Sequence, residues 1–171
     1  REAIMAGRKM QSEAVVPLGG GSVFDAAKAV AVGMRAEKDI WVIIARKLAI
    51  EQAAPIFGVL TLSGTSSEIN SGAVITNEET HEKFYFASPH AAPKVAIVDP
   101  GLQLTVPREQ VMAAGFDALS HILEAYFGGF DTSPVSVESC GSLAGSIIRC
   151  RRERAADEGK LLDNDIRSEM T

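Results

Sequence analysis

The chain has 171 residues, of which 46% are hydrophobic and 23% charged, with a formal net charge of -5 at pH 7. This length supports a sizeable core, and the acidic balance argues against a dedicated nucleic-acid binder. No apolar run is long enough for a transmembrane helix, so we expect no membrane partner. The two cysteines, Cys140 and Cys150, form neither a zinc motif nor a disulfide framework, which favours a cytoplasmic location.

The first half of the chain alternates predicted strands and helices. Residues 1–13 have the pattern of a polar helix end, and residues 14–18 predict a buried strand. Apolar residues at helical spacing predict a helix from Ser22 to about Met34, with Ser22 as its N-cap and Asp25 completing a capping box. The pattern of residues 35–55 is ambiguous, and within it residues 40–45 fit a strand.

Further strands are predicted before the pattern becomes helical. Short apolar runs predict strands at residues 57–61, 73–76 and 83–86, and a buried strand at 94–98. Proline near the first turn opens a long helical region at residue 105. Helices are predicted at 110–127, 137–152 and 154–171. The composition therefore predicts an α/β domain over residues 1–103 and a helical domain over residues 104–171.

Three glycines and a serine, residues 19–22, stand between the first predicted strand and the helix after it. A helix N-terminus offers unpaired N–H groups and a partial positive charge, and glycine lets a phosphate approach the backbone closely. The loop matches neither the Walker A motif nor the Rossmann GxGxxG motif. On these residues alone, a phosphate site and an ordinary tight turn both remain open.

A second polar cluster, TLSGTSSE at residues 61–68, also follows a predicted strand. Hydroxyl groups at the carboxyl end of a strand lie where α/β sheets bind ligands. The cluster is also rich in turn-forming residues. By itself it favours the simpler interpretation, an exposed loop.

Asp117 and His121 lie four residues apart in the predicted helix, so both project from one face. A carboxylate and an imidazole at this spacing can hold one divalent metal ion, but a metal site needs three or four ligands. The spacing alone favours an ordinary ion pair. His81 and His90 fall in predicted loops, where we expect solvated side chains.

Five segments, in this order and spacing, resemble the iron-containing, or group III, alcohol dehydrogenases. The clear resemblance covers residues 14–127 and is greatest to the butanol dehydrogenase-like, NADPH-dependent aldehyde reductase branch. Several motifs in order are far more specific than any one alone. The segments are GGGSVFDAAK (19–28), TLSGTSSE (61–68), GAVITNEETHEKF (72–84), IVDP (97–100) and GFDALSH (115–121).

This resemblance implies a partial Rossmann-like nucleotide-binding domain followed by the start of an all-helical metal-binding domain. It implies NADP or NAD as cofactor and a catalytic Fe²⁺ or Zn²⁺ ion. Asp117 and His121 would be the first two ligands of that metal. The implied nucleotide-binding residues are Gly20, Gly21 and Ser22 at the pyrophosphate, Asp25 near the nicotinamide, Thr61 and Thr65 along the cleft, and Lys83 reaching the nucleotide.

The implied activity is metal-dependent interconversion of primary alcohols and aldehydes by hydride transfer with NAD(P)(H), in a homodimer. Two alternatives stay open. One is a non-catalytic nucleotide- or partner-binding protein, and the other is a polyol dehydrogenase similar to glycerol dehydrogenase. Residues 72–84 favour the alcohol dehydrogenase branch over the second alternative.

The sequence departs from the family pattern in the polar cluster. Ser66 stands where the family has a glycine, and Leu62-Ser63 replace a common proline. The family's other two metal-binding histidines would lie beyond Thr171, and the first strands of its nucleotide fold would lie before residue 14. We therefore expect an internal fragment of a longer enzyme, inactive alone.

Overall fold

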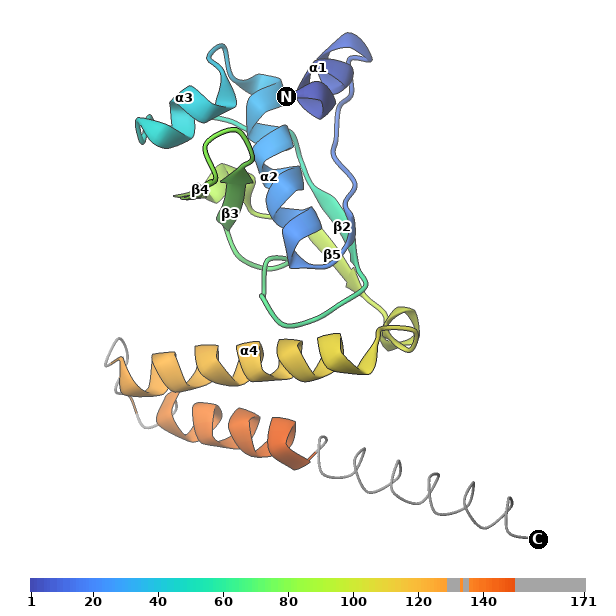
Figure 1. The fold of residues 1–171 in the computed structure, drawn as a ribbon, viewed down its shortest axis with the longest axis vertical. Helices are drawn as coiled ribbons and strands as arrows, with labels where there is room; N and C mark the ends of the chain where they lie inside the picture. The colour runs from blue at the N-terminus through green and yellow to red at the C-terminus, as the bar shows by residue number, and fades with distance from the viewer. Residues whose placement is uncertain (129–132, 134–135, 150–171) are drawn as a thin grey trace, which may run out of the picture. The chain divides into compact units, whose positions relative to one another are not determined.

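The computed structural model describes residues 1–128, 133 and 136–149 (Figure 1). It divides into two compact units, residues 1–114 and residues from 115 onward, which are described separately. The first unit combines a parallel sheet, a hairpin and helices, and the predicted α/β fold class is confirmed. The domain boundary predicted after residue 103 stays a prediction.

A three-stranded parallel sheet in the order β1-β2-β5 organises the first unit. The central strand β2 (Phe57–Leu60) pairs with β5 (Val95–Val98), which confirms both predicted strands. The first strand is shorter than predicted, since β1 comprises only Leu18–Gly19. A single bridge joins Val15 to Ile56 ahead of it. Pro17 has no N–H to donate to a ladder, which limits regular pairing there.

Helix α2 (Gly21–Arg35) covers one face of this sheet, as Figure 1 shows. The phenyl ring of Phe24 fills the space beside Gly58, where an added Cβ would lie 2.2 Å from the ring. Phe24 itself is fully buried. The glycine in β2 therefore allows the helix to pack closely on the sheet.

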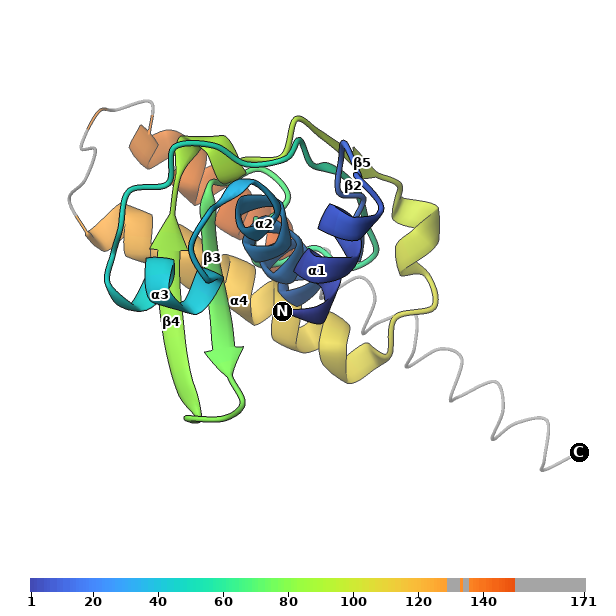
Figure 2. The same ribbon diagram turned by 90° about the horizontal axis from the view of Figure 1, so that it is seen from above.

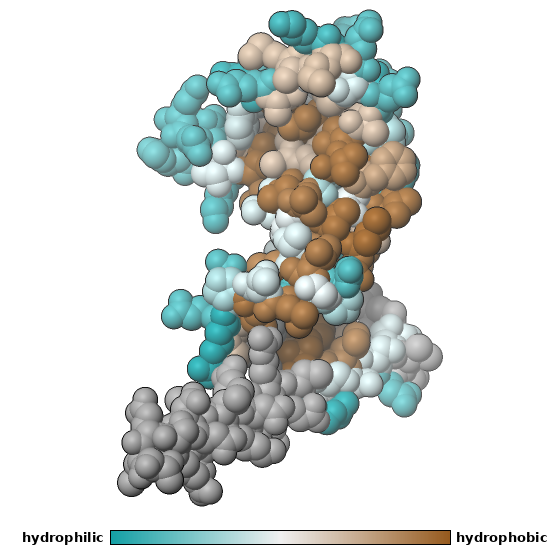
Figure 3. Space-filling model, turned by 90° about the vertical axis from the view of Figure 1, so that its right-hand side faces the viewer, coloured by the Kyte–Doolittle hydropathy of each residue, from teal (hydrophilic) through white to brown (hydrophobic). Residues whose placement is uncertain are grey.

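The opposite face of the sheet is exposed and apolar. The strands predicted at residues 14–18 and 94–98 were expected to be buried, and on this face that expectation was wrong. Side chains alternate across a strand, and α2 covers only the inward set. Figure 3 shows the apolar surface on this side of the unit. We call the exposed set the outer sheet face: Val16, Leu18, Phe57, Val95 and Ile97.

Helix α1 (Glu2–Lys9) lies beside α2 (Figure 2), which confirms the predicted polar helix. A Cβ at Gly33 of α2 would lie 2.3 Å from Ile4, and one at Gly7 of α1 would lie 2.8 Å from Met34. The Arg8 guanidinium donates hydrogen bonds to the carbonyls of Gly33, at 2.6 Å, and Ala36. Each helix thus fits a side chain into the other's glycine, and Arg8 caps the end of α2.

The strand predicted at residues 40–45 was wrong, because these residues form helix α3 (Ile40–Ala45). The Asp39 carboxylate accepts a hydrogen bond from Trp41 N at 2.9 Å and caps the helix. Ile40, Ile43 and Ile44 are buried together on one helical face. Capping and this i, i+3, i+4 spacing outweigh the strand preference of β-branched residues.

An antiparallel hairpin lies beside α2 and confirms the two strands predicted at 73–76 and 83–86. It consists of β3 (Gly72–Asn77) and β4 (Glu82–Ala87). Ala73 and Phe86 of the hairpin pack with Ile4, Val32 and Ile40 in the main core of the unit.

The elements not yet described are short 3-10 helices and the α-helices of the C-terminal part of the chain. The long helix predicted at 110–127 is confirmed, and residues 136–149 form the helix predicted at 137–152 as far as it is described. The helix predicted at 154–171 lies outside the described residues. Within the described residues, no helix is long and apolar enough to cross a membrane. The elements are η1 (Pro89–Ala91), η2 (Pro100–Gln103) and α4 (Arg108–Phe127).

Candidate nucleotide site and candidate metal ligands

The glycine loop lies at the carboxyl edge of the parallel sheet. β1 and β2 run in the same direction and end together at Gly19 and Leu60. At this edge α2 begins, and the carbonyl of Gly20 accepts hydrogen bonds from Val23 N at 3.0 Å and Phe24 N at 3.2 Å. The N–H groups of Gly21 and Ser22 lie before the first bonded N–H groups of the helix, at positions whose donors have no partner within an α-helix. Such donors can bind an anion.

The helix is capped differently from the prediction. Its N-cap is Gly20, with extended backbone (φ -88°, ψ -167°), and no side chain caps it. Ser22 lies within the first turn, so the predicted N-cap at Ser22 and the capping box with Asp25 were wrong. The Asp25 carboxylate cannot serve the N-cap because it bonds elsewhere, to Ser67 Oγ at 2.6 Å and Val74 N at 3.0 Å.

Close packing explains two of the three glycines, and none of the three has a positive φ. A Cβ at Gly19 would lie 2.6 Å from Val23, and one at Gly21 would lie 2.1 Å from Thr65 Oγ1. At Gly20 the nearest atom, Leu62 Cβ, would be an ordinary 3.4 Å away. Gly20 is therefore the glycine whose small size the protein's own packing does not require.

The polar cluster after β2 lies against this loop. Thr61 N donates to Gly19 O at 3.0 Å, and Thr65 contacts Gly21 as described. The structure thus brings Thr61 and Thr65 beside the start of α2. Ser63 is tied to Gln103 of η2 by two hydrogen bonds of 3.3 and 3.0 Å.

Ser66, the departure from the family glycine, has a left-handed backbone with φ 57°. Its carbonyl accepts hydrogen bonds from Ile69 N and Asn70 N, both at 3.1 Å. A serine in this region of the backbone costs free energy that a glycine would not. The loop therefore keeps a conformation suited to glycine although its residue is serine.

A buried lysine that the sequence analysis missed stands behind the cluster. Lys28 Nζ donates to Ser67 Oγ at 2.9 Å, Asn70 Oδ1 at 2.9 Å and Gly72 O at 2.6 Å. Burial lowers the pKa of Lys28, while the carboxylates of Asp25 and Glu68 oppose this shift. The available signal was its position four residues after Phe24, inside the apolar stripe of α2.

Lys83 is placed differently from the other predicted nucleotide-binding residues. It is exposed on β4 and pairs in register with Thr76 of β3. None of the hydrogen bonds described around Gly20, Thr65 or Asp25 involves it. Its role at a nucleotide stays a prediction.

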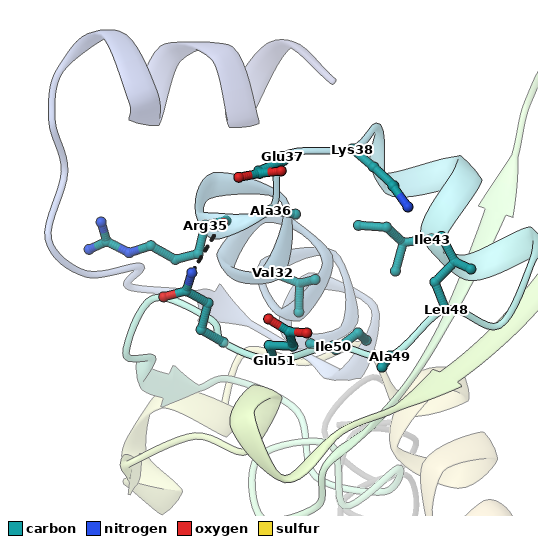
Figure 4. Close-up of a pocket in the computed structure, with 11 residues that line it drawn as sticks. Val32, Arg35, Ala36, Glu37, Lys38, Ile43, Leu48, Ala49, Ile50 and Glu51 are labelled. Atoms are coloured by element: carbon teal, nitrogen blue, oxygen red, sulfur yellow. Dashed lines mark hydrogen bonds between the residues drawn. The ribbon is translucent and has the colours of Figure 1, made fainter.

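A cavity of about 270 Å³ lies at the other end of α2 (Figure 4). Val32, Ile43 and Ile50 contribute apolar surface, and Arg35 and Glu51 contribute charges. Because α2 has 15 residues, this cavity is on the order of 20 Å along the helix from the glycine loop. It is therefore separate from the candidate nucleotide site.

In the second unit, Asp117 and His121 project from α4 as predicted. His121 Nε2 lies 3.7 Å from Asp117 Oδ2, and His121 Nδ1 lies 4.0 Å from Glu124 Oε2. The two side chains of the predicted pair are 45% and 54% exposed, respectively. Both imidazole nitrogens thus face a carboxylate, and the pair is accessible to an ion.

Comparison with known sequences assigns the chain to a family. The sequence model described as iron-containing alcohol dehydrogenase matches residues 1–100. The chain belongs to this family. The predicted resemblance is thereby confirmed.

Relatives in the iron-containing alcohol dehydrogenase family include butanol and propanediol dehydrogenases. The probable NADH-dependent butanol dehydrogenase 1 of Bacillus subtilis is 41% identical over 134 residues, which cover 78% of this chain and 35% of the relative. The 1,3-propanediol dehydrogenase of Klebsiella pneumoniae is 33% identical over 156 residues, covering 91% of this chain and 40% of the relative. The chain thus spans little more than a third of these relatives' length.

Solved structures of the family share this fold. The NADH-dependent butanol dehydrogenase A of Thermotoga maritima matches with a TM-score of 0.82 and 47% identity, over 86% of this chain and 37% of that one. The sulfoacetaldehyde reductase of Bifidobacterium kashiwanohense in complex with NAD⁺ matches with a TM-score of 0.70 and 33% identity, over 74% and 34% of the two chains.

The donor set on α4 fits part of the metal site that an iron-containing alcohol dehydrogenase requires. Two ligands of a tetrahedral site lie about 3.4 Å apart when each bond is about 2.0–2.1 Å long. The 3.7 Å between Asp117 Oδ2 and His121 Nε2 is close to this separation. Among the described residues, no group of three or more His, Cys, Asp or Glu side chains could hold a metal. The pair therefore fits as two ligands of a larger set.

Proposed function

We propose that this chain carries the pyrophosphate-binding loop and two metal ligands of an oxidoreductase that interconverts primary alcohols and aldehydes with NAD(H). The observation that supports it most strongly is the start of α2 at Gly20, at the carboxyl edge of parallel strands, in a member of the iron-containing alcohol dehydrogenase family. NADH in the names of the relatives supports NAD(H) over NADP(H).

The residues of the first unit would bind and orient the nucleotide. The N–H groups of Gly21 and Ser22 would donate to the pyrophosphate, and the helix dipole of α2 would favour its negative charge. Gly20 would leave room for the phosphate to approach. Thr61 and Thr65 would line the same edge, where Thr61 N already bonds to Gly19 O.

Asp117 and His121 would hold a divalent metal together with ligands from outside the described residues. Bound there, Fe²⁺ or Zn²⁺ would act as a Lewis acid on the substrate oxygen during hydride transfer. Imidazole and carboxylate ligands suit both ions. We also propose a cytoplasmic homodimer, supported by the family membership and by cysteine spacing without a disulfide framework.

Nucleotide binding by the purified chain tests the proposal through a substitution at Gly20. The backbone angles and the 3.4 Å space at Gly20 accept an alanine, so Gly20→Ala is expected to fold. Its methyl group would obstruct a phosphate at the helix start, and the Kd for NADH is expected to rise about tenfold or more. Fluorescence titration measures this, with NADPH titrated in parallel to compare the cofactors.

Gly141→Ala provides the matched control, because a Cβ at Gly141 meets nothing within 4 Å. This variant is expected to bind NADH as the unsubstituted chain does. Absence of binding of both nucleotides to the unsubstituted chain would contradict the proposed nucleotide site.

Turnover by the chain alone is not expected. Asp117 and His121 supply only two of the three or more protein ligands that a catalytic metal needs. Incubation with Fe²⁺ or Zn²⁺, NADH and a primary aldehyde should leave the absorbance of NADH unchanged. Measurable aldehyde-dependent oxidation of NADH would show that the fragment is active and overturn this expectation.

A further inference from the structure

Lys28 is fully buried in α2, with an exposed fraction of 0%. A buried ammonium group is costly unless its charge and all its donors are satisfied. Its three hydrogen bonds go to Ser67, Asn70 and Gly72. All three acceptors belong to the segment that runs from the polar cluster into β3, so this one side chain joins α2 to that segment at three points.

Asp25 holds the same segment one helical turn nearer the N-terminus. Its carboxylate accepts hydrogen bonds from Ser67 Oγ at 2.6 Å and from Val74 N at 3.0 Å. Ser67 therefore accepts from Lys28 and donates to Asp25, and it is 2% exposed. We call Lys28, Asp25, Ser67 and Asn70 the clamp.

Ser67 connects the clamp to the candidate nucleotide site. Its backbone N–H donates to Thr65 Oγ1 at 3.3 Å, and this threonine lies directly against Gly21. A shift of Ser67 would therefore displace Thr65 from the first turn of α2. Contacts through Ser67 and Thr65 thus link Lys28 to the first turn of α2, two helical turns away.

The charges around Lys28 also favour keeping the segment against α2. The carboxylates of Asp25 and Glu68 interact electrostatically with its ammonium group. Glu68 Oε2 is buried and has no hydrogen-bond partner among the described residues. Removing the lysine charge would leave both carboxylates uncompensated, and their repulsion would favour movement of the segment away from α2.

We propose that Lys28 is a positioning residue of the nucleotide site, which acts through Ser67 to fix Thr65 against the N-terminus of α2. It does not touch the ligand itself. This inference rests on the proposed nucleotide binding. A lysine with a purely structural role would change stability alone, whereas a positioning lysine changes the nucleotide affinity of the fully folded protein.

The variant Lys28→Met tests this inference, because methionine keeps an unbranched stem but removes the charge and the donors. With each protein held well below its own unfolding temperature, the Kd for NADH is expected to rise about tenfold in Lys28→Met, as when only about a tenth of the folded molecules keep Thr65 in its binding position. The exposed Lys9→Met is the matched control and should bind normally.

Val32→Ala separates positioning from general destabilisation. Val32 lies four residues further along α2, is buried in the main core and contributes to none of the clamp's hydrogen bonds. A cavity there lowers stability, but the folded variant should bind NADH with unchanged affinity. A Kd in Val32→Ala as high as in Lys28→Met would reduce the lysine to a structural role and overturn the inference.

If Lys28→Met does not fold, Ser67→Ala decides the question, because it leaves the bonds from Lys28 to Asn70 and Gly72 in place. It is expected to weaken NADH binding, and an unchanged Kd would overturn the positioning role. If the unsubstituted chain binds neither NADH nor NADPH, the proposed function fails. If it binds and Lys28→Met binds equally well, only the present inference fails.

Discussion

Ser66 has a backbone conformation that is unfavourable for serine. Its φ of 57° lies in the left-handed region, where a residue other than glycine costs about 1–2 kcal/mol. Ser66→Gly removes this cost but adds chain entropy to the unfolded state. We expect a net gain of about 0.5–1 kcal/mol in the free energy of unfolding, measured by urea denaturation.

Ser71→Gly is the control for this substitution, since Ser71 does not have a positive φ. It should lower the free energy of unfolding by about 0.5–1 kcal/mol through chain entropy alone. A loss of stability in Ser66→Gly similar to that in Ser71→Gly would show that the backbone at position 66 is not strained.

Because of Lys28, the free energy of unfolding is expected to depend on pH, and the direction of this dependence can be worked out. Burial lowers the pKa of its ammonium group below the ordinary 10.5, against the opposing carboxylates of Asp25 and Glu68. Between the lowered pKa and 10.5 the folded chain binds fewer protons than the unfolded chain, so the contribution of Lys28 to stability rises with pH. It is least favourable below the folded pKa.

Urea denaturation at increasing pH tests this sign by comparison with Lys28→Met, which cannot titrate. The difference in unfolding free energy, unsubstituted chain minus variant, is expected to grow as the pH approaches 10.5. A difference that shrinks with pH would mean that the pKa of Lys28 is raised in the folded state.

At the scale of elements, the six-residue helix α3 depends on its cap. Asp39 accepts the hydrogen bond from Trp41 N and also forms an exposed ion pair with Arg1 at 3.0 Å. Asp39→Ala is expected to lower the free energy of unfolding by about 1 kcal/mol through loss of the cap. Thermal or urea denaturation measures the change.

Asp39→Asn separates the two roles, because asparagine keeps a capping oxygen but loses the ion pair. Exposed ion pairs contribute little, so this variant should stay within about 0.5 kcal/mol of the unsubstituted chain. Equal losses in Asp39→Ala and Asp39→Asn would assign the stabilisation to the ion pair with Arg1 and contradict the cap.

Elements with a clear period were predictable from sequence, and those decided by contacts were not. α2 and the hairpin follow the helical and alternating patterns they were predicted from. Residues 40–45 are an unbroken apolar run, which the sequence pattern does not distinguish as strand or helix. Their burial in the core with Val32 and Phe86 decided for helix.

The candidate site was predictable where it lies in the backbone and not where it lies in side-chain contacts. The glycine loop follows from a strand and a helix that sequence patterns reveal. The clamp needs Lys28 to meet Ser67, 39 residues later, and local periodicity carries no such information. The cap at Gly20 was missed because serine is normally preferred over glycine at this position.

At the scale of the whole molecule, the outer sheet face is an exposed apolar surface. Parallel sheets are normally covered on both faces, yet here Leu18 is 66% and Ile97 55% exposed. We expect the chain to bind the dye ANS and to associate at high concentration, because contiguous apolar surface does both.

The double variant Leu18→Lys, Ile97→Lys is expected to reduce ANS fluorescence and association, with little loss of stability because both side chains are exposed. Light scattering measures association. Ile69→Lys, an exposed loop substitution at 74% exposure, should change neither property. Unchanged ANS binding in the double variant would show that the outer sheet face is not the surface that binds the dye.

The contact between α1 and α2 ties the first residues of the chain to its central helix. An eight-residue helix is too short to be stable by itself, so α1 depends on the fit of Ile4 at Gly33. In return, Arg8 binds the last carbonyls of α2. The two segments are therefore expected to open as one cooperative unit, so that hydrogen exchange gives the same free energy of opening for the amides of α1 and of the last turn of α2.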